Sequence, residues 1–140
     1  MPETNLCPFC GSDDHTVAKQ NDLAQVILSD PHKVPGHVLV MPKRHVVQPW
    51  ELTPEELQAC FDLIYFIEQR FIGKLGDGID VRQNYRPFKG QDDFKVNHVL
   101  FHVLPRSADD YLYSVSEHYE AELFAALDEV ERDAVTKLLK

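Results

Sequence analysis

Two histidines stand where this sequence is otherwise most apolar. His98 and His102 lie in the run N-H-V-L-F-H-V-L-P-R, residues 97–106. The run is rich in β-branched and aromatic residues and Pro105 closes it, which is typical of a buried β-strand. Alternate side chains of a strand share a face, so His98, Leu100 and His102 are expected on one side of the sheet.

The spacing of these histidines argues against a shared metal ion. On a strand their Cα atoms lie about 13 Å apart, whereas imidazole nitrogens bind zinc at about 2.0–2.1 Å. His98 and His102 are therefore expected to serve two different places, with Leu100 midway between them. A pair of core histidines bonded to backbone is the simpler alternative, and the spacing leaves it open.

The second reactive motif is C-P-F-C-G at residues 7–11. Cys7 and Cys10 have the C-x-x-C spacing with which two thiolates share one zinc ion. A redox pair is typically placed at a helix N-terminus, but mostly polar residues precede this motif and the turn-like G-S-D-D follows it. We expect zinc rather than a redox pair or metal-free packing, and two further ligands must come from elsewhere in the chain.

The elements that position these residues indicate an α+β fold with a mainly antiparallel sheet. Apolar runs at 23–28 and 36–41 flank a turn-like segment and predict a hairpin, and residues 79–85 alternate as a third strand. T-P-E-E at 53–56 predicts a capped helix start, and apolar residues at helical spacing carry this helix to about Gly73 or Gly76. Tyr65, Phe66 and Ile72 widen its apolar surface, as either a dimer face or a broad core contact. Further helices are predicted near 114–127 and 128–139.

Composition narrows the function. A chain of 140 residues is expected to form one domain, and a net charge of −9 argues against a nucleic-acid-binding surface. No apolar run is long enough for a membrane span, and the polar N-terminus is unlike a signal peptide. Three cysteines, an odd number, favour a reducing compartment, so the cytoplasm is the expected location. The loop at 86–95 carries Arg86, Lys89 and Lys95, and the histidine run ends in Arg106. These four cations indicate either a small phosphorylated ligand or a solvated face.

H-V-L-F-H-V-L-P-R resembles the signature of the histidine-triad (HIT) family, in which three histidines alternate with apolar residues, often before Pro-Arg. His98 falls on the first triad histidine, Leu100 on the middle one and His102 on the third. P-G-H-V-L-V-M-P-K-R-H-V, residues 35–46, is similar to the strand that runs beside the triad in that family. The resemblance covers residues 5–106. It implies a HIT-like fold of about five strands packed with helices in one domain over residues 1–140, with 107–140 as a helical tail, and a homodimer of two chains.

The resemblance also implies a ligand set and nucleotide contacts. In zinc-bearing members two histidines complete the site begun by C-x-x-C, so the implied structural Zn²⁺ ligands are Cys7, Cys10, His45 and His98. Such a Cys₂His₂ set leaves no open position for substrate. For His37 we expect only a backbone partner within its strand. The nucleotide contacts implied are His102, Gln91, Lys95, Arg106 and, for the ribose, Asp30.

Leu100 separates this sequence from the family's chemistry. In the family the middle imidazole attacks the α-phosphorus of a nucleoside phosphate, and a covalent nucleotidyl-histidine forms. Leucine has no lone pair, so the sequence predicts a nucleotide-binding protein of the nucleotidyl hydrolase or transferase type that is inactive or weakly active. Three interpretations stay open: an altered enzyme, a natural nucleotide binder, or weak hydrolysis through His102 or a water. A zinc-stabilised interaction module without a nucleotide site is the alternative from another class.

Overall fold

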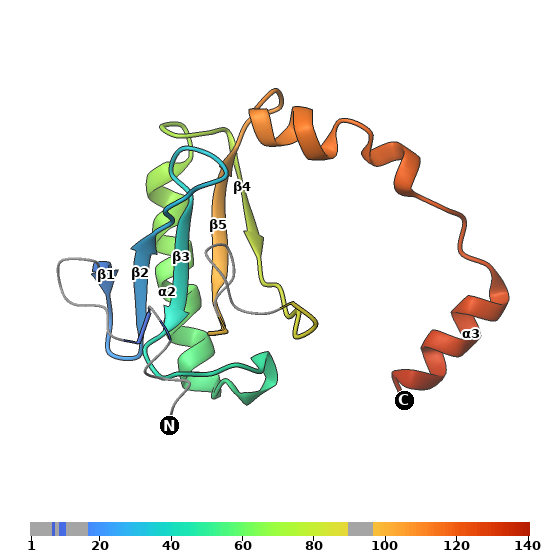
Figure 1. Ribbon diagram of the computed structural model, residues 1–140, viewed down its shortest axis with the longest axis horizontal. Coiled ribbons are helices and arrows are strands. Elements are labelled where there is room, and N and C mark those ends of the chain that lie inside the picture. Colours follow the sequence, from blue (N-terminus) through green and yellow to red (C-terminus); the bar gives the residue numbers. More distant parts are fainter. Residues whose placement is uncertain (1–6, 8, 11–16, 90–96) are drawn as a thin grey trace. The chain divides into compact units, whose positions relative to one another are not determined.

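A computed structural model describes residues 7, 9–10, 17–89 and 97–140 (Figure 1). The chain divides into two compact units, Met1–Asp110 and Tyr111–Lys140. They are described separately. Among the described residues, no helix is long and apolar enough to cross a membrane.

The first unit is built on a five-stranded antiparallel sheet with the order β1-β2-β3-β5-β4. The strands are β1 (Val17–Gln20), β2 (Ala24–Leu28), β3 (Val38–Pro42), β4 (Gly78–Arg82) and β5 (Phe101–Arg106). The α+β class and the antiparallel sheet expected from the sequence are confirmed. β1 was not predicted, because its four residues V-A-K-Q carry no alternation and three of them are exposed.

The long helix α2 (Pro54–Phe71) begins where the sequence predicts. The Thr53 hydroxyl accepts a hydrogen bond from the Glu56 N–H, and the Glu56 carboxylate accepts one from the Thr53 N–H, which together make a capping box. The same carboxylate is buried and binds Arg44 at 2.7 Å. The helix start is thereby fixed to the segment that follows β3.

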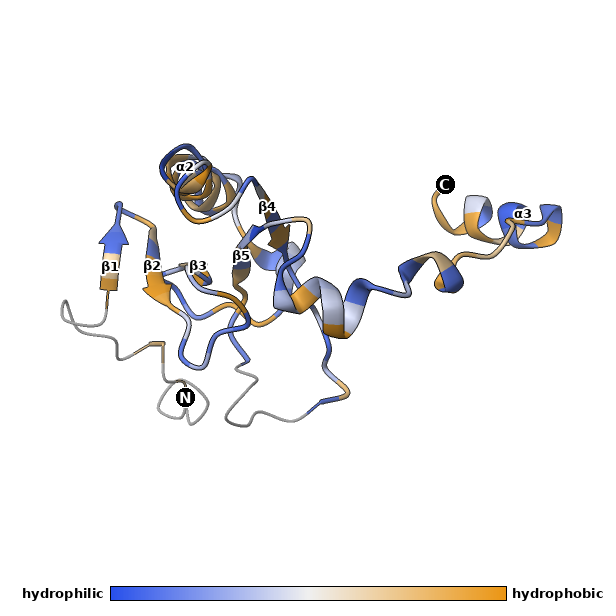
Figure 2. Cartoon of the chain, turned by 90° about the horizontal axis from the view of Figure 1, so that it is seen from above, coloured by the Kyte–Doolittle hydropathy of each residue, from blue (hydrophilic) through white to orange (hydrophobic). Residues whose placement is uncertain are grey.

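The two faces of the sheet are covered differently, and α2 lies against only one of them (Figure 2). On the α2 face, the main core joins residues of α2 such as Leu63 and Ile64 to Val40 and Val103 of the strands. On the opposite face, Ile27, Leu39 and Met41 form a smaller buried cluster, against which Phe9 and Leu100 pack. The even-numbered residues of β5 belong to this second face.

Two strands are shorter in the structure than the sequence predicts. β5 begins at Phe101 rather than at residue 97, because the Val99 N–H donates to the carbonyl of Val46, beyond the end of β3. His98 therefore lies in the segment that leads into the strand. β4 ends at Arg82, so residues 83–85 are not part of it.

The second unit contains a short π-helix η2 (Tyr113–Glu117), a short 3₁₀ helix η3 (Glu120–Leu123) and the helix α3 (Glu129–Leu138). The helix expected near 114–127 is thus replaced by two short helical segments. Asp128 caps α3 by accepting a hydrogen bond from the Glu131 N–H, so the predicted helix at 128–139 is confirmed. η2 begins without a side-chain cap, and the Ser114 hydroxyl donates to the carbonyl of Tyr111.

Candidate functional site

Cys7, Cys10, His45 and His98 meet at one end of the sheet, and their ligand atoms all lie within 4.8 Å of one another. The Sγ of Cys10 lies 3.1 Å from His45 Nδ1 and 3.6 Å from His98 Nδ1, and the Sγ of Cys7 lies 3.5 Å from His98 Nδ1. Adjacent ligand atoms of a tetrahedral zinc site are separated by about 3.3–3.8 Å, given the usual Zn–S and Zn–N bond lengths. The four residues can therefore hold one metal ion.

The orientation of His98 suits a metal ligand. Its Nε2 donates to the carbonyl of Pro42 at 2.9 Å, which fixes the ring proton on Nε2 and leaves the lone pair of Nδ1 toward the two sulfurs. Burial lowers the pKa of His98, and repulsion from His45 adds to this effect. The neutral form, which binds metals, is thereby favoured.

The two thiols point to the same conclusion. The pKa of Cys10 is raised to about 11, first by burial and then by the hydrogen bond and charge of Cys7. A divalent cation between the two sulfurs would supply the positive charge that stabilises both thiolates. In addition, His45 Nε2 is buried and has no hydrogen-bond partner among the described residues.

A second group of imidazoles lies on the sheet face opposite α2. His37 Nε2 lies 2.9 Å from His102 Nδ1, and the backbone N–H of Lys33 donates to His37 Nδ1 at 3.1 Å. Because His37 Nδ1 accepts, the proton of its neutral ring is on Nε2, which donates to His102. His102 then carries its own proton on Nε2 and can offer it to a ligand.

The loop before β3 aims His37 at this partner. Gly36 has a φ of 86°, which L side chains rarely adopt, and a Cβ there would lie 2.9 Å from the Leu75 side chain. The expected backbone partner of His37 is present, but the sequence did not indicate its bond to His102. A histidine directly before β3 was a weak signal, because the contact joins residues 65 positions apart.

Burial lowers the pKa values of both histidines to about 4. For His102 the further causes are the positive charges of Lys33, Arg82 and Arg86, and for His37 they are led by His102. At neutral pH this places two uncharged imidazoles in a positive field, which suits an anionic ligand better than a cationic one.

Leu100 lies between the two groups of histidines. Its partly buried side chain packs against the cluster of Ile27, Leu39 and Met41 on the face opposite α2. Position 100 is therefore lined by apolar side chains, and leucine contains no group that can attack phosphorus.

The remaining predicted contacts are scattered. Arg106 is held by Asp110 through two bonds of 2.6 and 3.1 Å and by Asp80 at 2.6 Å, which gives it a structural ion-pair role. Asp30 is exposed, and the hydroxyl of neighbouring Ser29 is engaged by the carbonyl of Pro31. Gln91 and Lys95 lie outside the described residues. Their roles as nucleotide contacts stay predictions.

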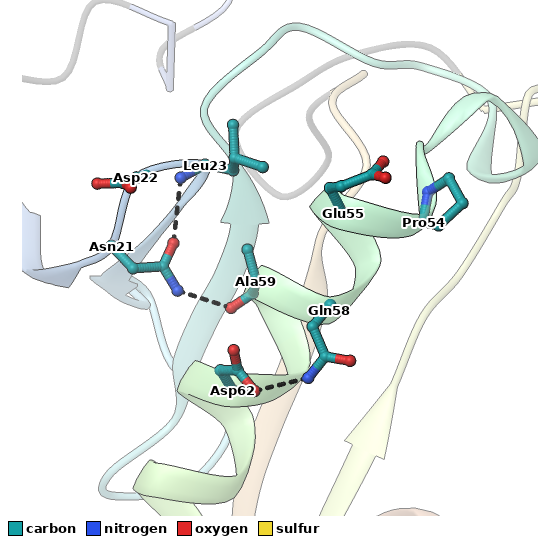
Figure 3. A pocket seen from close by; sticks show the side chains of 8 residues that line it. All are labelled: Asn21, Asp22, Leu23, Pro54, Glu55, Gln58, Ala59 and Asp62. Carbon is teal, nitrogen blue, oxygen red and sulfur yellow. Dashed lines mark hydrogen bonds between the residues drawn. The ribbon is translucent and has the colours of Figure 1, made fainter.

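A hollow of about 530 Å³ lies elsewhere, between the β1–β2 turn and the first turns of α2 (Figure 3). Asn21 closes this turn by accepting from the N–H groups of Leu23 and Ala24, and it donates to the carbonyl of Ala59. The walls are acidic and include none of the cysteines or histidines described above. This hollow is unsuited to a phosphate.

The family model of the HIT domain matches residues 11–109 of this chain, and the chain belongs to this family. A bis(5'-nucleosyl)-tetraphosphatase [asymmetrical] of Schizosaccharomyces pombe is 33% identical over 105 residues, which make up 64% of this chain and 51% of that protein. The chain thus spans about half the length of that relative. An uncharacterised HIT-like protein of Methanocaldococcus jannaschii is 30% identical over 96% of this chain and 99% of its own length.

Solved structures agree on the fold. A HIT family member from Bacillus subtilis superposes with a TM-score of 0.68 at 20% identity, over 95% of this chain and 94% of that one. A Zn-bound histidine triad family protein from Mycobacterium smegmatis gives a TM-score of 0.61 at 26% identity, over 78% of this chain and 81% of that chain. The HIT fold expected from the sequence is confirmed.

Proposed function

We propose that this protein binds a nucleoside phosphate on the sheet face that carries His37, Leu100 and His102. The hydrogen-bonded pair of neutral imidazoles beside Leu100 is the observation that carries this proposal. His102 donates a hydrogen bond to an oxygen of the α-phosphate, and His37 holds the ring of His102 in the required tautomer. The bound phosphate lies over Leu100.

Membership in a family with a tetraphosphatase relative supports a phosphate ester of a nucleoside as the ligand. The covalent step of the family requires a lone pair at position 100, and leucine provides none. We therefore propose binding without a nucleotidyl-enzyme and at most slow turnover.

We also propose Zn²⁺ as the ion held by Cys7, Cys10, His45 and His98. Two thiolates and two imidazoles are a preferred ligand set for zinc, and a relative of the same fold is described as Zn-bound. When bound, the ion supplies a cross-link between the Cys7–Cys10 segment, the segment after β3 and the start of β5. It supplies no reacting group, because all four positions are filled by the protein.

A homodimer is the assembly we propose. β4 lies at the edge of the described sheet, and all five of its residues are half-buried. The neighbouring flank of α2 exposes Tyr65 and Ile72, whereas Phe66 lies beneath Lys19 and Arg70 at 4.1 and 4.7 Å from its ring centre. A second copy would extend the sheet at β4 and cover this flank.

Light scattering of the wild type and of Tyr65→Glu tests the homodimer, and a dimer is expected only for the wild type. A monomeric wild type would contradict the proposal.

Binding is tested by titrating zinc-loaded protein with AMP and adenosine, followed by calorimetry and by the shift in melting temperature. AMP is expected to bind and to raise the melting temperature, and adenosine to bind more weakly. His102→Ala should remove most of this difference. If neither compound binds, the zinc-stabilised interaction module becomes the better account.

A further inference from the structure

Arg82 faces His102 directly across two neighbouring strands. In the antiparallel pair of β4 and β5, Arg82 is the register partner of His102, and on the other side of β5 His102 is paired with Leu39 of β3. Residues directly opposite on an antiparallel pair point to the same face, with Cβ atoms about 4.5–5.5 Å apart. Arg82 thus belongs to the sheet face that carries the histidine pair.

Asp80 positions the guanidinium of Arg82. Its Oδ2 lies 2.9 Å from Arg82 Nη2 and 2.6 Å from Arg106 Nη1. One carboxylate is therefore shared by two guanidinium groups. The ion pair with Asp80 helps to orient the guanidinium of Arg82.

Two further cations converge on the same place. The Lys33 backbone binds His37, and repulsion from Arg82 and Arg86 adds to burial in lowering the pKa of the Lys33 amine. Among the ion pairs of the described part of the chain, none involves Lys33 or Arg86. Three cations thus gather beside the histidine pair, in a protein whose net charge is −9.

We propose that Arg82, flanked by Lys33 and Arg86, forms an anion subsite beside His102 that binds the second phosphate of a nucleoside diphosphate or triphosphate. This inference rests on the proposed function, which places the α-phosphate at His102. The β-phosphate then extends toward β4, away from the zinc ligands. Arg82 makes the direct contact, because its planar fork can bind two phosphate oxygens.

The subsite predicts that affinity rises with the number of phosphates. A charge-assisted hydrogen bond to a phosphate in a partly buried site typically changes affinity by about ten- to hundredfold. ADP should bind at least about tenfold more tightly than AMP, because AMP lacks the group that contacts Arg82. A structural role of Arg82 alone would change the melting temperature and leave the ratio of the two affinities unaltered.

The experiment is calorimetric titration of the zinc-loaded full chain with ADP and AMP in magnesium-free buffer. It compares the wild type with Arg82→Gln, Arg82→Lys and the matched control Arg70→Gln, which removes the same charge from the exposed end of α2. In Arg82→Gln, ADP affinity should fall about ten- to hundredfold, to near that of AMP. Arg82→Lys should restore part of the preference, and Arg70→Gln should keep all of it.

Each result separates the subsite from the proposed function. Wild-type protein that binds AMP and ADP equally would overturn the subsite while leaving nucleotide binding in place. Equal weakening of both ligands in Arg82→Gln would also overturn it. Protein that binds neither ligand would overturn both. If Arg82→Gln does not fold, the double variant Lys33→Gln/Arg86→Gln takes its place. It should lose part of the ADP preference, because Arg82 keeps its direct contact, and an unchanged preference would overturn the subsite.

Discussion

His37 Nε2 lies 2.9 Å from His102 Nδ1, so a residue directly before β3 holds the ring of the second residue of β5. The pair is neutral at physiological pH because burial lowers the pKa values of both rings to about 4. Neutral rings can form this bond with one donor and one acceptor, whereas two protonated rings would repel each other. The arrangement therefore depends on pH.

The first prediction concerns stability in mild acid. The ordinary pKa of histidine in an unfolded chain is 6.5, above the folded values of about 4. Well above pH 6.5 both rings are neutral in the folded and in the unfolded protein, so the pair adds no pH dependence. Between pH 6.5 and 4 the unfolded state binds more protons than the folded state. As the pH is lowered through this range, the free energy of unfolding should therefore fall by at most about 1.4 kcal/mol per pH unit for each histidine.

Urea unfolding at pH 7 and pH 5 measures this loss. His37→Gln should show a smaller decrease than the wild type, because one titrating ring is gone. His118→Gln, a matched substitution in the second unit, should retain the wild-type decrease. A His37→Gln protein that loses as much stability as the wild type would contradict the assignment of the pair. Contributions from the metal ligands are common to all three proteins and cancel in the comparison.

The second prediction concerns the metal. Elemental analysis should find about one zinc per chain. Cys7→Ser should remove it and reduce the free energy of unfolding by several kcal/mol, because the binding energy of a structural site is folding energy. Cys60→Ala is the control, since Cys60 is a buried residue of α2 in the main core, apart from the four clustered ligands, and this variant should keep the zinc. Metal-free wild-type protein with the stability of the loaded form would exclude a structural zinc site.

The third prediction concerns Glu56, whose pKa is lowered to about 2, first by its bond to Arg44. Glu56→Ala removes half of the capping box and leaves Arg44 without this partner, at a cost of about 2 kcal/mol. Because Arg44 precedes His45, one of the four proposed ligands, this variant should also lose zinc faster to a chelator. Glu55→Ala, its exposed neighbour, should change stability by less than about 0.5 kcal/mol and retain the zinc. Equal effects of the two variants would show that the ion pair between Arg44 and Glu56 does not stabilise the metal site.

Local sequence signals predicted much of this molecule. The capping residues and apolar spacing marked α2, and the C-x-x-C motif with two family histidines identified four residues that the structure brings together. The contacts of His37 and Arg82 with His102 were not predictable in the same way. They depend on the register of three strands that are distant in sequence, and a slip of one residue would place these side chains on the opposite face.

The fourth prediction concerns Leu100, which packs over Leu39 and Met41 beside the histidine pair. Histidine is close to leucine in size, and the position is only partly buried, so Leu100→His should fold and bind zinc. The new imidazole would lie two residues from His102 and supply the lone pair that the covalent step needs. Hydrolysis of ADP or of a dinucleoside polyphosphate should rise from near background by orders of magnitude. Removal of the nucleophile of a serine protease lowers its kcat roughly 10⁶-fold, which is a loose guide to the size of the expected increase.

A nucleotide labelled at the α-phosphate, with the reaction stopped by acid during turnover, distinguishes a covalent intermediate from a mere effect of a more polar residue at position 100. Leu100→His should retain label as a nucleotidyl-histidine, while the wild type and Leu100→Asn should not, since the asparagine amide is polar but not nucleophilic. The double variant Leu100→His/His102→Ala should react more slowly, because His102 no longer donates to the phosphate. Label on the wild-type chain would locate the nucleophile elsewhere. Absence of label on a folded Leu100→His protein that binds nucleotide would show that position 100 does not face the α-phosphorus.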